Sequence, residues 1–343
     1  MKIKMIVAMA VFFSMSAVSL IQAAAQSAKP VELAFAYQLP PVHFMHKRVI
    51  EPWAKEVEEK CGGKIKITLY PAESLVKAKD TYEAVVKGVA DIGWGLHHLN
   101  PGRFPLTEVM HLPFLVPSMD AFGAAFKQLY EKQYLKGEYK GVKVLWLSGA
   151  PPSQLLTAKK PVRTLEDMKG LIINTDSAIV PTIKAFGASP TQVPPPELYT
   201  SLQLGVIAGT TSPTAGILMY RLHEVAKFMT MADVSSITTY AVMNINTWNS
   251  LPPDVQKTID ELSGIDVYNR RWANIQLEEE AAAQKILQKA SVEFIRLQPE
   301  EREKWKKLAR PSYEKWSEAV AAKGLPGKEV LAEVSKIFEG SGK

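Results

Sequence analysis

The sequence predicts an α/β protein with two lobes whose sheets are rich in parallel strands. Apolar strands alternate with helices along residues 31–95 and again along 169–213, which is the order of βαβ units and favours parallel pairing. Glycine and proline at residues 149–152 indicate a crossing from one lobe to the other. A helical pattern over residues 253–290 is too long for one small lobe, so we expect it to span both.

The first lobe is expected to comprise residues 26–150 together with about 241–270. Its strands show period-two alternation, and its first helix carries an apolar stripe that ends at Gly62 and Gly63. The expected strands are residues 31–37, 64–70, 91–95 and 142–147, and the expected helices are residues 44–60 and 81–87.

The second lobe is expected to comprise residues 151–240 together with about 290–343, with a return crossing near 240–246. A faint internal repeat supports two similar lobes, because residues 82–93 and 199–209 share a helix, a glycine stop and a strand. Chance similarity remains an alternative, since glycine commonly follows a helix.

Residues 253–290 are expected to form one long helix that begins with Pro253 in its first turn. A further helix begins near Pro299 and is interrupted at Pro311. This C-terminal segment is expected to cover the folded lobes.

The first 25 residues are typical of a secretory signal peptide. Lys2 and Lys4 precede an apolar run, and Ala23 to Ala25 provide a small-residue exit. The apolar run is short for a membrane span, so cleavage near Ala25 and export to the periplasm are expected. A retained membrane anchor is the alternative.

Composition excludes several classes of function. Residues 1–25 contain two lysines and no acidic residue, so cleavage lowers the formal net charge from +6 to +4. Basic residues are mostly interleaved with acidic ones on predicted helices, which does not favour nucleic-acid binding. Cys61 is the only cysteine, so no internal disulfide can form and the fold depends on buried apolar area.

Sequence signatures of common enzymes are absent. There is no Gly-x-Ser-x-Gly elbow and no glycine-rich or Walker phosphate loop, and Cys61 has no histidine nearby in sequence. We therefore expect a binding protein, not an enzyme, and no cofactor.

The ends of the predicted strands carry the candidate ligand-binding residues. Asn174 closes the strand that follows residues 169–171, and ligands of α/β layers meet the carboxyl ends of strands. Aromatic side chains at or beside other strand ends are expected to line the same cleft. Trp94 is expected to have open space on both sides, because Gly93 and Gly95 flank it. These aromatic residues are Tyr37, Phe44, Trp94 and Trp146, and core packing is the alternative for each.

Four histidines suggest a second interpretation of the site. His43 and His46 lie one helical turn apart, and His97 and His98 follow a predicted strand. The four rings could converge on a metal ion, which would make the chain a metal-binding or enzymatic exported protein. We expect no metal, and instead that His43 and His97 act as hydrogen-bonding groups of the pocket.

Six segments of the chain, in their order and spacing, resemble the solute-binding proteins of TRAP transporters, the dicarboxylate-type family, over essentially the whole mature chain. They are residues 58–67 (EEKCGGKIKI), 86–93 (VKGVADIG), 112–115 (LPFL), 165–171 (LEDMKGL), 186–190 (FGASP) and 197–205 (ELYTSLQLG). The resemblance implies a two-lobed periplasmic-binding-protein fold that closes on a small-molecule solute. It also implies delivery of that solute to TRAP membrane permease subunits, and we expect the receptor to be a monomer.

The chain departs from this family where charge is expected. The family's strand usually ends in an arginine that grips a ligand carboxylate with two hydrogen bonds, and Asn174 stands there. Residues 208–213 (AGTTSP) replace an acidic second-lobe motif, and the arginine that often follows the crossover is replaced within residues 149–154. Thr211 and Ser212 therefore become candidate ligand contacts.

Two ligand classes remain open from the sequence. One is a small organic acid, aromatic or monocarboxylate, held by His43 or His97, by Thr211 and Ser212, or by helix-start N–H groups. The other is an uncharged polar solute. We expect Asn174→Ala to weaken ligand binding with little change in melting temperature.

Overall fold

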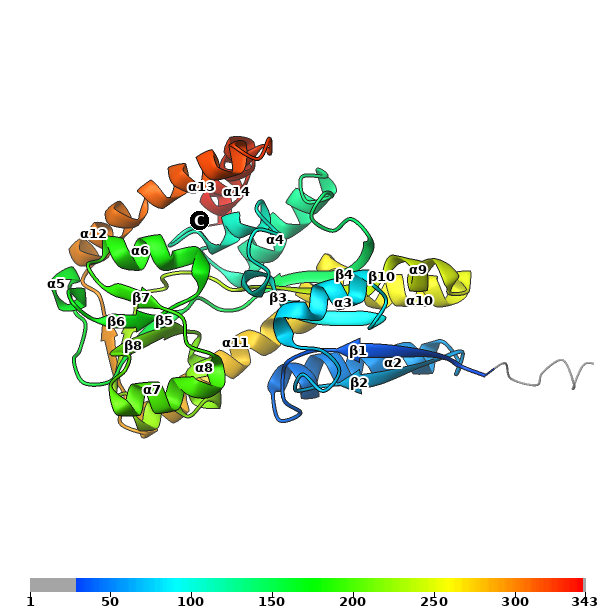
Figure 1. The fold of residues 1–343 in the computed structure, drawn as a ribbon, viewed down its shortest axis with the longest axis horizontal. Helices are drawn as coiled ribbons and strands as arrows, with labels where there is room; N and C mark the ends of the chain where they lie inside the picture. The colour runs from blue at the N-terminus through cyan, green and yellow to red at the C-terminus, as the bar shows by residue number, and fades with distance from the viewer. Residues whose placement is uncertain (1–28, 342–343) are drawn as a thin grey trace, which may run out of the picture.

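The computed structural model describes residues 29–341, and the expected signal peptide lies outside this range. Two separate sheets form the two halves of the molecule (Figure 1). The first has the strand order β2-β1-β3-β10-β4 and the second the order β11-β9-β5-β8-β6-β7.

The first sheet confirms the alternation of strands and helices expected near the N-terminus. The helix predicted for residues 44–60 begins with a π-helical stretch, η1 (His46–Ile50), before Pro52, which lacks the N–H of a regular turn. The elements of this half are β1 (Val31–Ala36), α2 (Glu51–Lys60), β2 (Ile65–Tyr70), η2 (Ala78–Asp80), α3 (Thr81–Val86), β3 (Ile92–Leu96), η3 (His97–Leu99), η4 (Thr107–His111), α4 (Met119–Glu131), β4 (Val142–Gly149), β10 (Thr238–Asn244), α9 (Ile245–Ser250) and α10 (Pro253–Leu262).

The second sheet repeats the helix, glycine and strand unit of the first. Gly88 after α3 and Gly205 after α7 both have a φ of 73°, a left-handed conformation that glycine adopts without steric cost. The elements of this half are β5 (Gln154–Thr157), α5 (Leu165–Met168), β6 (Ile172–Asn174), η5 (Ser177–Ile179), α6 (Val180–Ala185), β7 (Ser189–Thr191), η6 (Pro195–Glu197), α7 (Leu198–Leu204), β8 (Gly209–Ser212), α8 (Thr214–Met219), η7 (Leu222–Glu224), β9 (Phe228–Met231) and β11 (Glu293–Arg296).

Both sheets are mixed, with five parallel and four antiparallel strand pairs among the described residues. The antiparallel pairs all involve β5 or β10, the first strand after each crossing between the sheets. The two crossings lie side by side, since Ala150 N–H donates to Ile237 O at 2.8 Å and Ser153 N–H donates to Ser235 O at 2.8 Å.

The return crossing lies earlier in the chain than predicted. Residues 240–246 were expected to cross, but Thr238–Asn244 form β10, whose seven residues are all buried between β3 and β4. The chain instead crosses between Met231 and Thr238. An apolar strand in the centre of a sheet has no turn signal of its own, which explains the error.

The single helix predicted over residues 253–290 is two helices, α10 and α11 (Ile265–Lys289). Gly264 separates them with a φ of 104°, and Ser263 beside it accepts a hydrogen bond from Trp53 Nε1 at 3.3 Å. The 25-residue helix α11 is roughly 37 Å long. It contacts β4 and α4 of the first half and α8 of the second (Figure 1).

The C-terminal helices divide between the two halves, whereas residues 290–343 were expected to belong to the second lobe. Trp305 of α12 (Pro299–Ala309) packs on Phe186 of the second half. In contrast, α14 (Gly327–Ser341), which follows α13 (Pro311–Ala321), packs against α4 of the first half. Val330, Val334 and Phe338 of α14 complete the apolar cluster beside α4.

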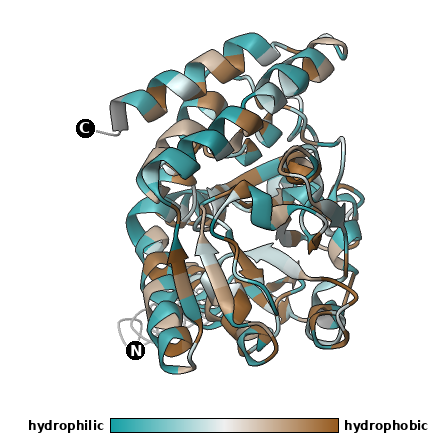
Figure 2. Ribbon diagram, turned by 90° about the vertical axis from the view of Figure 1, so that its left-hand side faces the viewer, coloured by the Kyte–Doolittle hydropathy of each residue, from teal (hydrophilic) through white to brown (hydrophobic). Residues whose placement is uncertain are grey.

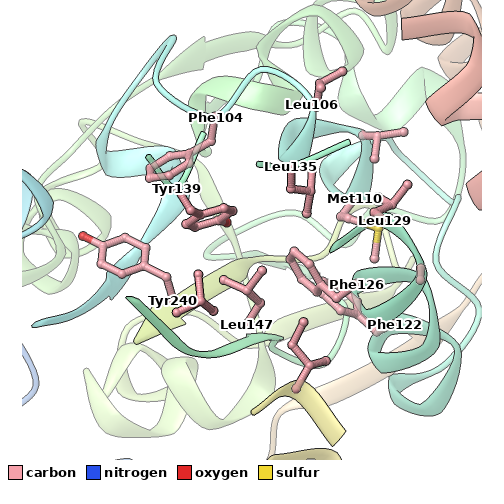
Figure 3. Close-up of a cluster of buried hydrophobic side chains, with 14 of the residues drawn as sticks. Phe104, Leu106, Met110, Phe122, Phe126, Leu129, Leu135, Tyr139, Leu147 and Tyr240 are labelled. Carbon is pink, nitrogen blue, oxygen red and sulfur yellow. The ribbon is translucent and has the colours of Figure 1, made fainter. Parts of the chain in front are cut away.

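That cluster is rich in aromatic rings, and Figure 3 shows Phe104, Tyr139 and Tyr240 beside the aliphatic side chains that α4 and β4 contribute. The helices alternate between hydrophilic and hydrophobic residues, whereas several strands are largely hydrophobic (Figure 2). Within residues 29–341, no helix combines the length and the apolar character that a membrane span requires.

Candidate functional site

A cavity of about 590 Å³ lies between the two halves of the molecule. The first half contributes the loop before η1 and the end of β3, and the second half contributes the ends of β6 and β8. Helix α11 contributes Gln276 and Glu280. The carboxyl ends of parallel strands from both sheets therefore meet at one place, as is usual for ligand sites in α/β layers.

Asn174 lines this cavity and is held firmly by its neighbours. Its side-chain Nδ2 donates to Thr210 Oγ1 at 2.9 Å, and its Oδ1 accepts the Val193 N–H at 2.7 Å. An asparagine side chain has two N–H hydrogens, so one remains for a ligand. Asn174 thus joins β6 to β8 and to the loop before η6, in addition to facing the cavity.

Thr211 and Ser212 also line the cavity, at the end of β8. The Thr211 hydroxyl lies 2.9 Å from Thr175 Oγ1, and Ser212 Oγ donates to Pro213 O at 3.1 Å. A hydroxyl retains acceptor capacity after it donates. These side chains therefore present small polar groups on an otherwise apolar wall.

Trp94 forms part of the opposite wall. The side chain is 3% exposed, and its buried Nε1 has no hydrogen-bond partner among the described residues. The open space expected beside it is absent, since a Cβ on Gly93 would lie 2.7 Å from Val85 and one on Gly95 would lie 2.3 Å from Tyr240. The glycines allow α3 and Tyr240 to approach the strand closely.

His43 and Phe44 complete this wall with stacked rings, 4.6 Å apart between centroids. His43 Nδ1 accepts the Met45 N–H at 3.0 Å, which places the ring proton on Nε2. Burial, and then the nearby His46, lower the pKa of His43 to about 4. His43 is therefore neutral at pH 7 and offers an Nε2–H donor.

Three predicted site residues lie away from the cavity, in the core of the first half. Tyr37 is 1% exposed and its hydroxyl pairs with His46 Nδ1 at 2.6 Å. Trp146 is fully buried against Trp53 and the aromatic residues of α11. His97 Nε2 lies 2.7 Å from the Tyr139 hydroxyl. Each occupies the face of its strand or turn that points into the core.

The predicted ligand contacts omitted several polar residues of the cavity, including Asp176 and also His98, which was considered only as a metal ligand. They also omitted the α11 pair. Glu280 accepts the N–H groups of Thr214 at 2.8 Å and Ala215 at 2.9 Å, and Gln276 Nε2 donates to Gly149 O at 2.8 Å. Their spacing of four residues on the buried face of a long helix was the available signal.

The cavity has an unusual charge pattern. None of its lining residues is a lysine or an arginine, whereas Asp176 and Glu280 are acidic. Burial raises the pKa of Asp176, and His98 and backbone N–H groups oppose that rise. A ligand carboxylate would therefore meet neutral donors in place of a guanidinium.

The four histidines considered as metal ligands do not converge. Across residues 29–341, no group of three or more His, Cys, Asp or Glu side chains is arranged to hold a metal ion. His46 and His97 are each paired with a tyrosine hydroxyl. The geometry of residues 29–341 therefore does not support a metal site formed by these histidines.

Comparisons with known proteins identify a family and several relatives of this chain. The sequence profile of bacterial extracellular solute-binding proteins, family 7, matches residues 35–319. The C4-dicarboxylate-binding periplasmic protein DctP of Rhodobacter capsulatus is 26% identical over 320 residues, which cover 90% of this chain and 93% of the relative.

Two solved structures have the same fold. A TRAP periplasmic solute binding protein from Desulfovibrio salexigens is 31% identical, with a TM-score of 0.80 over 91% of this chain and 96% of that one. A TRAP periplasmic solute binding protein from Bordetella bronchiseptica with bound mandelate is 27% identical, with a TM-score of 0.81 over 90% and 99%.

Proposed function

Because the chain belongs to the bacterial extracellular solute-binding proteins of family 7, the TRAP solute-binding proteins, we propose that its cavity captures a small organic acid for delivery to a TRAP membrane permease. The acid has an apolar or aromatic body and one carboxylate. Export to the periplasm follows from the expected signal peptide and agrees with the family's location. Catalysis is not part of the proposal, in agreement with the missing enzyme signatures.

The buried indole N–H of Trp94 carries this proposal. An N–H group without a partner in a dry site costs free energy unless a ligand supplies an acceptor. His43 Nε2–H and the remaining N–H of Asn174 are further neutral donors on the cavity walls. A carboxylate accepts several such bonds and would satisfy them together.

The rest of the lining supports an apolar ligand body. Apolar side chains come from both halves, among them Leu39, Phe44, Leu99, Val193, Leu198 and Met219. The Bordetella bronchiseptica relative holds mandelate, an aromatic acid with one carboxylate. A second carboxylate, as in a C4-dicarboxylate, would lack a cationic partner here and would approach Asp176 or Glu280.

An uncharged polar solute is the second candidate. It is favoured by the absence of lysine and arginine from the lining. Neutral donors and acceptors suffice for an amide or an alcohol, and no charge then has to leave water.

We further propose that the two halves act as hinged lobes of a monomeric receptor. One lobe would comprise residues 31–149 and 238–262, with α13 and α14 packed on it. The other lobe would comprise residues 154–231 and 293–309. The paired crossings and α11 would be the hinge. The molecular mass of the mature protein from light scattering tests whether it is a monomer. A decrease in the radius of gyration on ligand addition tests closure of the lobes.

A thermal-shift panel tests the ligand class. Benzoate, mandelate, succinate and benzamide are added to the purified mature chain, since a ligand that binds the folded state raises the melting temperature in proportion to ln(1 + [L]/Kd). Stabilisation by benzoate or mandelate supports the proposal. Stabilisation by benzamide alone supports an uncharged solute. Stabilisation by succinate alone refutes both proposed ligand classes, the organic acid with one carboxylate and the uncharged solute.

A further inference from the structure

His98 differs from the other histidines near the cavity. Its side chain lines the cavity, and neither ring nitrogen forms a hydrogen bond with any residue of the described chain. Its Nδ1 is buried and without a partner. By contrast, His43 accepts a backbone N–H, His97 pairs with Tyr139 and His111 pairs with Thr238.

The position of His98 follows from the local chain direction. It is the second residue of η3, directly after β3. The preceding His97 points into the apolar cluster, where it packs on Phe104 and Tyr240 (Figure 3 shows both rings). His98 is therefore turned toward the cavity, on the same wall as Trp94.

Three neighbouring titratable groups influence His98. Asp176, in the loop between β6 and η5 of the other half, favours its protonated form. His97 on its own element and His111 on η4 disfavour a second positive charge beside them. Burial is the largest influence and lowers the pKa of His98, which favours the neutral imidazole in the free receptor.

Asp176 does not supply the missing partner. Its Oδ1 accepts the Ala178 N–H at 3.0 Å, and among the described residues it acts on His98 through its charge, without a hydrogen bond or ion pair between the two side chains. The carboxylate of Asp176 is thus held by its own turn. His98 retains an open ring nitrogen in a cavity that contains no fixed positive charge.

We propose that His98 is the counter-ion of the bound organic acid, and that its imidazole takes up one proton from solvent when the carboxylate binds. This inference rests on the proposed function of the cavity. A carboxylate beside an imidazole favours the imidazolium form, so the receptor binds the acid as an anion together with a proton. A titratable cation would take the part of the permanent guanidinium that the family usually carries where this chain has Asn174.

Proton uptake makes affinity depend on pH. Between the pKa of His98 in the free receptor and its higher value in the complex, each fall of one pH unit strengthens binding by up to about tenfold. Below the free value His98 is already protonated, and above the higher value it remains neutral, so the dependence vanishes at both ends.

Titration calorimetry with mandelate and benzoate tests the inference. The enthalpy is measured in phosphate and in Tris at the same pH, because the difference between the buffers reports the protons taken up. We expect an uptake above zero and at most about one proton per site at pH 7. His98→Gln should abolish the uptake and flatten the pH dependence of Kd.

Two variants separate the alternatives. His223→Gln is the matched control, because His223 also has a buried Nδ1 without a partner but does not line the cavity; it should bind like the wild type. Asp176→Asn should retain proton uptake. Uptake that survives His98→Gln but is lost in Asp176→Asn assigns the proton to Asp176 and overturns the inference.

The remaining outcomes are also decisive. Binding of either acid without proton uptake in the wild type overturns the inference but leaves the proposed function intact. If neither acid binds, the proposed function fails and the inference fails with it. As an independent readout, the NMR shift of the His98 ring should move to the imidazolium position on binding, while that of His223 should not.

Discussion

The Glu280 carboxylate of α11 accepts the backbone N–H of Thr214 at 2.8 Å, and the adjacent N–H of Ala215 binds its other oxygen. The first two N–H groups of α8 are therefore held by a side chain of the helix that lies along both halves. This arrangement fixes α8 and the end of β8, where Thr211 and Ser212 face the cavity.

Replacement of Glu280 should loosen that wall. In Glu280→Ala, two N–H groups at the buried start of α8 lose their acceptor, so we expect the free energy of unfolding to fall by about 1–3 kcal/mol and ligand affinity to fall with it. Denaturant unfolding and calorimetry measure the two effects. Glu279→Ala, which removes only a pairing with Arg48, is the control and should change each far less.

Asn174→Ala should now affect stability as well as binding. The side chain joins Thr210 to Val193 through two hydrogen bonds, so we expect a loss of about 1–2 kcal/mol in unfolding free energy. This revises the expectation of an unchanged melting temperature. Thr210→Val removes one of the same bonds without touching the cavity lining; if it weakens binding as much as Asn174→Ala, direct contact of Asn174 with ligand is refuted.

Trp94→Phe should test the hydrogen bond from the indole to the ligand. The substitution removes an N–H group that has no partner among the described residues and keeps most of the apolar ring. We expect binding of the organic acid to weaken about tenfold or more, the usual effect of a lost hydrogen bond to a charged group. Because Trp94 packs in the core, the variant should also lose some stability.

Trp146→Phe provides the matched comparison for Trp94. Trp146 Nε1 is also buried and has no partner in residues 29–341, but the residue is fully enclosed by the core and does not line the cavity. Its replacement should change stability and leave Kd unaltered. Equal losses of affinity in both variants would contradict the assignment of Trp94 to the site.

Glu138 should make stability decline as pH rises. It is 6% exposed, and burial raises its pKa to about 7, although bonds from Thr107 and Leu106 oppose this. A carboxyl with a raised pKa in the folded state contributes stability that is complete below its unfolded pKa and lost as pH rises through 7. The loss is on the order of 3 kcal/mol for a shift of this size.

Glu138→Gln isolates this effect. Unfolding free energies are compared at pH 5, 6, 7 and 8, where the wild type should lose stability relative to the variant as pH increases. The comparison is needed because buried His97, whose pKa is lowered to about 3, contributes a rise with pH instead. Glu131→Gln, an exposed acid nearby, should run parallel to the wild type.

Much of the fold was predictable because it depends on local patterns. Alternation placed β1 and β2 within a residue of their ends, and the glycine after α3 and α7 marked both repeat units. The break at Gly264 was missed because the sequence on each side continues the helical pattern, although Ser263-Gly264 is a turn signal like the glycines at other helix ends. It depends on Trp53 and Leu145, which come from distant parts of the chain.

The candidate site was predicted less completely. Asn174, Trp94, His43, Phe44, Thr211 and Ser212 do line the cavity, because strand ends converge in an α/β layer. Tyr37, His97 and Trp146 do not, since which side of a strand or turn faces a cavity depends on how the second half packs. His97 and His98 are adjacent in sequence, yet one is core and the other lines the cavity.

The position of β10 between β3 and β4 constrains the order of assembly during synthesis. A nascent chain that has emerged as far as residue 230 contains four strands of the first sheet but lacks the strand that connects β3 to β4. Contacts so distant in sequence form slowly. The N-terminal half is thus unable to complete its sheet until most of the polypeptide has left the ribosome.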